Sequence, residues 1–161
     1  MSVISAICRS GYFQLRQLCP VARSCTVDAA KTTVHAFIAC RLDYCNSLLH
    51  GITDSLSWQL QSIQNAAARL ITGTRRRDHI TQVLMDLHWL PVRRRVDDKL
   101  ALLVYMSLHG LAPSYLANDC ILASSDKFRH RLQLANVDTC IVPRACTRIG
   151  DRSFPTAGPR I

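Results

Sequence analysis

The stretch from Leu56 to Arg77, LSWQLQSIQNAAARLITGTRRR, constrains the fold of this chain more than any other. Its apolar side chains recur at steps of three and four residues, so a helix would place them all on one face. This stripe consists of Leu56, Leu60, Ile63, Ala67 and Leu70. Gly73 is a typical helix-ending residue, and the three arginines after it complement the partial negative charge of a helix end. The stretch therefore predicts a helix with one buried face and one cationic end.

Periodicity and capping residues predict four more helices around this one. They are expected from about Ser2 to Leu18, from Thr26 to Gly51, from His79 to about Leu87 with Asp78 as the cap, and from Pro91 to about His109. The first of them should end before Pro20, because the residue before a proline disfavours the helical conformation. Residues 113 to 117 add a helical turn.

The helical pattern weakens after residue 122. Leu132 to Leu134 and Cys140 to Val142 are short β-leaning runs, and glycines and prolines interrupt residues 150 to 159. This end of the chain is expected to form a hairpin or a loosely packed extension. With 161 residues, 48% of them hydrophobic, the chain is long enough for one core. The predicted fold is mainly α: a bundle of about five helices over residues 1–122, then an irregular extension over residues 123–161.

Arginine dominates the charge of this chain. The formal net charge of +9 comes from 20 basic and 11 acidic residues; 17 of the 20 are arginine, whose forked guanidinium suits phosphate, and all the acids are aspartate. Two arginine triplets stand at predicted helix ends, and a turn at residues 80–87 would bring them to one rim of the bundle. The candidate nucleic-acid-binding residues are Arg69, Arg75, Arg76, Arg77, His79, Arg93, Arg94, Arg95 and Lys99. The alternative is a basic surface that only keeps the protein soluble.

Other constellations favour structural roles over chemistry. Asp97 and Asp98 are adjacent in a helix and point about 100° apart, which suits a solvated face better than a shared metal ion. Cys40, Cys45 and His50 step by five residues and cannot share a helix face, and no Cys-x-x-Cys motif occurs. Cys45 with His79 is the best remaining Cys/His pair, and nothing in the sequence tethers the two. No catalytic residue, metal or cofactor is therefore expected.

The eight cysteines raise the question of compartment. The first apolar run, Val3 to Cys8, is too short for a signal peptide, and no run approaches the ~18 apolar residues of a membrane span. We therefore expect an intracellular protein, nuclear or cytoplasmic, that is not secreted, has no membrane partner and keeps its cysteines reduced.

Four runs of this sequence resemble the reverse transcriptase of non-LTR, LINE-type retrotransposons of the jockey-like kind, in the part that follows the polymerase palm. They are AAKTTVHAFIACRLDYCNSLLHG (29–51), LQSIQNAAARLITGTRRRDHITQVLMDLHWLPVRRRV (60–96), LHGLAPSYL (108–116) and GDRSFPTAGPRI (150–161). The Gln-Asn-Ala-Ala-Ala-Arg-Leu and Leu-His-Trp-Leu-Pro-Val segments carry most of the specificity. The resemblance implies a thumb-like helical element that grips RNA or an RNA/DNA template–primer duplex.

The departures from the family pattern limit what the resemblance implies. The palm signature Tyr-Ala-Asp-Asp is missing, so no catalytic residue carries over, and the chain stops at Ile161, where the family continues with Trp-Asn-Ser-Leu-Pro. The leading hypothesis is thus a truncated, non-catalytic fragment of an RNA-directed DNA polymerase that binds nucleic acid and takes no small-molecule substrate. The alternative is a domesticated helical module that binds protein through Trp58, Trp89 and the apolar stripe.

Overall fold

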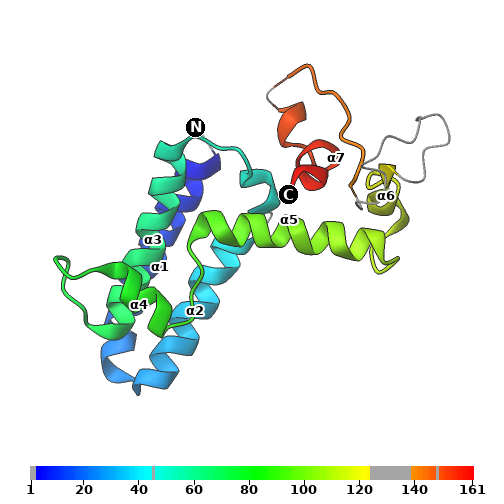
Figure 1. Cartoon of the computed structure of the whole chain (residues 1–161). Coiled ribbons are helices and arrows are strands. Elements are labelled where there is room, and N and C mark those ends of the chain that lie inside the picture. Colours follow the sequence, from blue (N-terminus) through cyan, green and yellow to red (C-terminus); the bar gives the residue numbers. More distant parts are fainter. Residues whose placement is uncertain (1–2, 45, 124–138, 148) are drawn as a thin grey trace. The chain divides into compact units, whose positions relative to one another are not determined.

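The computed structural model describes residues 3–44, 46–123, 139–147 and 149–161, and the fold is mainly α (Figure 1). The α-helices are α1 (Val3–Ser24), α2 (Val27–Asp43), α3 (Asp54–Thr72), α4 (Ile80–Asp86), α5 (Val92–Leu108), α6 (Ser114–Ala117) and α7 (Phe154–Ala157). Short 3₁₀ helices are η1 (Asn46–Leu49), η3 (Gly150–Arg152) and η4 (Gly158–Arg160). The predicted mainly-α class is confirmed.

The expected hairpin is not confirmed. In the ranges that the structure describes there is no strand, and a single antiparallel bridge pairs Leu122 with Cys140. The run from Leu132 to Leu134, the other half of the expected hairpin, lies outside the described residues.

Two helix ends differ from the sequence prediction. Helix α1 continues past Pro20 to Ser24, so the expected stop before the proline is wrong. The proline costs one backbone donor near the helix end, and the Ser24 hydroxyl donates to the Pro20 carbonyl at 3.1 Å over the added turn. Helix α2 stops at Asp43 rather than at Gly51, because Tyr44 takes an extended backbone conformation and the chain continues into η1.

The chain forms two compact units. The first comprises residues 1–46 and 52–95, and the second comprises residues 47–51 and 96–161, so α5 begins in one unit and continues in the other. The boundary expected between residues 122 and 123 falls inside the second unit.

The first unit is a bundle in which α1, α2 and α3 each pack against the other two and α4 packs against α3 (Figure 1). The apolar stripe of α3 forms its centre, as predicted: Leu60, Ile63 and Ala67 are fully buried. Gly11 of α1 lies so close to α3 that a Cβ atom there would come within 3.0 Å of Ile63 Cγ2. The lack of a side chain at Gly11 therefore allows α1 and α3 to approach closely.

The second unit has a small core of its own. Val96 and Leu100 of α5 and Ala157 of α7 are buried together, with Leu49 and Phe154 packed against them. The Arg152 guanidinium donates to the His50 carbonyl at 2.8 Å and to the Leu48 carbonyl, which ties η3 to residues 47–51. His50 Nδ1 also lies 3.6 Å from the Asp97 carboxylate. None of the helices within the described residues is both long enough and apolar enough to cross a bilayer.

Two left-handed residues end α3 and α4. Gly73 has φ +67°, and its N–H donates to the Arg69 carbonyl at 2.9 Å, which confirms the predicted glycine cap. His88 takes φ +56° after α4. Its N–H donates to the Met85 carbonyl, and the N–H of Trp89 donates to the Leu84 carbonyl. This is the Schellman pattern, with a histidine where glycine is usual. Both caps turn the chain sharply.

Replacing Gly73 with alanine should destabilise the first unit by about 1 kcal/mol, because a Cβ atom is strained at positive φ. Steric contact plays no part, since no atom lies within 4 Å of the Cβ position. Chemical denaturation followed by circular dichroism measures the change. Gly73→Asn should lower the free energy of unfolding less than Gly73→Ala, because asparagine tolerates the left-handed region. Equal decreases in the two variants would contradict this explanation.

Candidate nucleic-acid interface

The chain turns back after α3 and runs antiparallel along one side of it. We call residues 73–91 the return segment. Helix α4, within this segment, packs against α3. The end of the return segment meets the middle of α3, where the Gln64 amide donates to the Leu90 carbonyl at 2.8 Å. The start of α5 then lies beside the first turn of α3, because Arg93 forms an ion pair with Asp54. The predicted turn at residues 80–87 is thus present.

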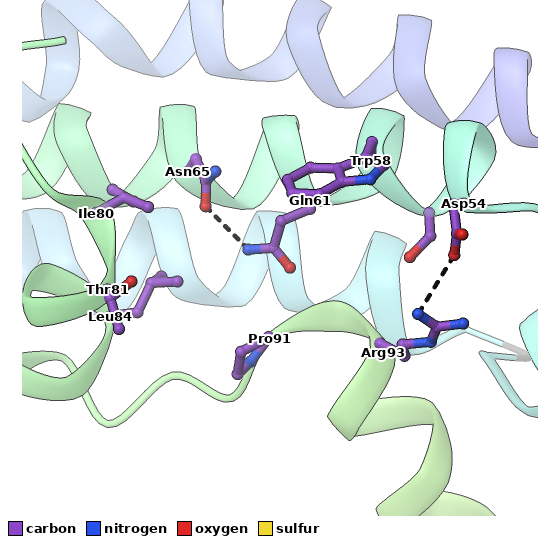
Figure 2. Close-up of a pocket in the computed structure, with 10 residues that line it drawn as sticks. Asp54, Trp58, Gln61, Asn65, Ile80, Thr81, Leu84, Pro91 and Arg93 are labelled. Atoms are coloured by element: carbon purple, nitrogen blue, oxygen red, sulfur yellow. Dashed lines mark hydrogen bonds and ion pairs between the residues drawn. The ribbon is translucent and has the colours of Figure 1, made fainter. Parts of the chain in front are cut away.

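Two glutamines of α3 hold the return segment in place. Gln64 is 1% exposed, and its Oε1 accepts a hydrogen bond from Gln61 Nε2 at 3.0 Å. Gln61 Oε1 accepts the Val92 N–H at 2.9 Å, and Gln61 Nε2 also donates to Asn65 Oδ1 at 2.9 Å (Figure 2). We call Gln61 and Gln64 the glutamine clamp. It satisfies the carbonyl of the residue before Pro91 and the N–H of the residue after it, while Pro91 has no N–H of its own.

The first arginine triplet lies in the loop between α3 and α4. Arg75, Arg76 and Arg77 are all exposed, and none of their guanidinium groups forms an ion pair with a residue that the structure describes. The Asp78 carboxylate accepts the Arg75 backbone N–H at 3.0 Å and so orders the loop. The prediction that Asp78 caps α4 is wrong. His79 occupies the cap position without a side-chain hydrogen bond, and it is exposed.

The second triplet divides into three different environments. Arg95 has a side chain only 17% exposed and contacts Asp43 Oδ1 of α2 at 2.9 Å, which makes it part of the bundle. Arg93 contacts Asp54 at 3.3 Å, with both side chains about three-quarters exposed, at 71% and 74%. Arg94 is exposed and has no ion-pair partner in the described part of the chain. Of the three candidate binding residues in this triplet, Arg95 is therefore the least exposed to solvent.

The two remaining candidate residues, Arg69 and Lys99, belong to different units. Arg69 is partly exposed on α3, and its Nε is buried without a hydrogen-bond partner among the described residues. Lys99 is exposed on the part of α5 that belongs to the second unit.

The two triplets lie at opposite ends of α3. Arg93 pairs with Asp54, the first residue of α3, whereas Arg75 follows Thr72, its last residue, by three positions. An α-helix rises ~1.5 Å per residue, so these ends are about 27 Å apart. The single compact rim that the sequence suggested is replaced by two cationic patches joined by the return segment.

Three thiols that are at least half-buried, those of Cys8, Cys120 and Cys140, are not activated. Burial raises the pKa of the Cys8, Cys120 and Cys140 thiols above the ordinary cysteine value, although a hydrogen bond to Ser107 partly opposes this for Cys120. A nucleophilic cysteine needs the opposite shift. Cys45, the thiol of the weak Cys/His pair, lies outside the described residues.

Comparisons with protein-family models, with curated proteins and with solved structures find no match to this chain.

Replacing Gln64 with alanine should destabilise the protein by about 3 kcal/mol, because it leaves the Leu90 carbonyl unpaired and opens a cavity in the bundle. Gln59→Ala is the matched control. Gln59 lies on the same helix and is exposed, so this substitution should change the free energy of unfolding by no more than about 0.5 kcal/mol. Urea unfolding of both variants measures the difference. Equal midpoints would show that the clamp does not hold the return segment.

Proposed function

We propose that this chain is a non-catalytic fragment of a non-LTR retrotransposon RNA-directed DNA polymerase, from the thumb-like region that contacts template–primer nucleic acid. The sequence resemblance suggests the family. One observation carries the binding proposal: Arg75, Arg76, Arg77 and Arg94 are exposed at the two ends of α3, and their guanidinium groups form no ion pair with a described residue. Guanidinium groups in that state are free to meet phosphate.

The spacing of the two patches suits a nucleic acid that lies along the return segment. A strand advances ~3.4 Å per nucleotide in a duplex, so about 27 Å corresponds to roughly eight nucleotides. Each phosphate that an arginine neutralises releases a condensed counterion, which favours binding at low salt. The glutamine clamp supports this mode of binding, because it fixes the second patch relative to α3.

In this role the chain binds nucleic acid, and a polymerase palm domain catalyses the reaction. We infer that it works inside the cell, in the nucleus or cytoplasm, where its nucleic-acid partner is present. The alternative proposal, a protein-binding module, names Trp58, Trp89 and the apolar stripe. Trp89 is 7% exposed, with its ring centroid 5.3 Å from that of His35. The centre of the stripe is fully buried and its ends, Leu56 and Leu70, are half-buried, so Trp58 is the most exposed of these features.

The triple variant Arg75→Ser, Arg76→Ser and Arg77→Ser should make the salt dependence of binding shallower. If the three arginines contact three phosphates, the slope of log affinity against log salt should fall in magnitude by roughly 2 to 3. Fluorescence anisotropy with a labelled RNA and a labelled RNA/DNA duplex, at several salt concentrations, gives the slope.

The matched control is Arg16→Ser, Arg23→Ser and Arg41→Ser, which removes the same charge from exposed positions on α1 and α2. Its slope should change by less than about 1, because long-range charge effects are screened beyond about 10 Å. Equal changes in both triple variants would leave a solubilising surface as the explanation. Self-association that does not respond to salt, with no binding to nucleic acid, would favour the protein-binding module.

A further inference from the structure

A groove lies between α3 and the return segment and begins at the second arginine patch, since Arg93 lines it. It has a volume of about 440 Å³ and is lined by Trp58, Asn65, Ile80, Leu84 and Pro91, with Arg93 at its edge (Figure 2). Pockets for small planar ligands usually fall between ~300 and 1,000 Å³, so a nucleobase fits this space. We propose that the groove takes one unpaired base of a single-stranded nucleic acid, stacked on Trp58.

Trp58 is the best stacking surface that the described residues offer. It is 72% exposed although it belongs to α3, the helix at the centre of the bundle. The Trp58 side chain lies outside the core, whereas α3 itself is held in place by its buried apolar stripe and by the Gly73 cap. A flat ring on a rigid element is what proteins that bind single strands use to stack bases of any sequence.

The polar groups in the groove divide into occupied and free ones. Both ends of the Gln61 amide are used by the glutamine clamp, so Gln61 forms a fixed wall rather than a ligand contact. The Asn65 amide oxygen accepts from Gln61, but its amide nitrogen has no partner among the described residues. A free amide donor two helical turns from Trp58, in the same groove, is suited to the carbonyl or ring nitrogen at the edge of a base.

The charge around the groove selects the occupant. Arg75 to Arg77 follow one end of α3 and Arg93 and Arg94 stand at the other, so a chain that crosses the groove meets cations on both sides. Asp54 opposes this charge at the rim, but its ion pair with Arg93 is exposed and weak enough for a phosphate to replace it. A polyanion with flat, apolar side groups matches these features, and a single strand of RNA or DNA is such a polymer.

This inference rests on the proposed nucleic-acid binding, and the experiment separates the two. The full chain, Trp58→Ala and Trp58→Phe are each titrated with a labelled single-stranded oligothymidylate of about eight nucleotides, the length that spans ~27 Å. The same titrations are repeated with an abasic strand of equal length, which keeps every phosphate and has no bases. Phe13→Ala is the matched control, because Phe13 is a similarly exposed aromatic residue on α1.

Trp58→Ala should weaken binding of the oligothymidylate between about 5-fold and about 150-fold, the range of one base–aromatic stack, with an unchanged salt slope. Trp58→Phe should keep most of the affinity, and Phe13→Ala should keep all of it. On the abasic strand the wild type and Trp58→Ala should bind equally. The sequence has two tryptophans, and Trp89 is buried, so quenching on binding should come from Trp58 and disappear in Trp58→Phe.

Three outcomes would overturn the inference. If Trp58→Ala binds the oligothymidylate as tightly as the wild type, while the Arg75–Arg77 variant still has a shallower slope, the arginines bind phosphate and no base enters the groove. If Trp58→Ala abolishes self-association in sedimentation and leaves oligonucleotide affinity unchanged, a second copy of the chain occupies the groove. If the wild type binds neither the single strands nor the RNA/DNA duplex at low salt, the proposed function fails, and this inference fails with it.

Discussion

The candidate interface depends on two amide side chains that fix the return segment to α3. Gln64 is buried and donates to the Leu90 carbonyl, and Gln61 accepts the Val92 N–H, so the backbone on both sides of Pro91 is anchored to one helix. A buried polar group is costly unless it is paired, and these amides are paired with each other as well as with the backbone. The position of Arg93 and Arg94, the shape of the groove and the exposure of Trp58 all follow from this anchoring.

Sequence periodicity predicted the elements of the first unit well, because the bundle is built on apolar stripes. The stripe of α3, its glycine cap and the turn at α4 all follow from residue spacing and turn chemistry. Gln64 was missed because a count of apolar positions treats a glutamine as surface. One signal was available: Gln61, Gln64 and Asn65 share a helix face, and the Leu-Pro junction downstream needs partners for its backbone groups.

The sequence was less informative where long-range contacts decide the outcome. Arg95 is adjacent to two exposed arginines, and only the approach of Asp43 from α2 makes it structural. Trp89 and Trp58 are equally apolar, yet one packs beside His35 and the other faces solvent. The sequence also did not predict the stop of α2 at Asp43 or the division of α5 between two units. These differences reduce the basic surface that the sequence suggested to two smaller patches.

At the start of α5, Arg94 differs from Arg93 and Arg95 in its electrostatic surroundings. Basic side chains in a first helical turn oppose the helix dipole, at a cost of about 0.3–1 kcal/mol each. Asp43 offsets this cost for Arg95 and Asp54 offsets part of it for Arg93, since each lies within 4 Å of its guanidinium. Arg94 has no such partner in the described residues, so its dipole cost is not offset. A phosphate held there would supply the missing negative charge, which connects the unfavourable placement of Arg94 to the proposed grip on nucleic acid.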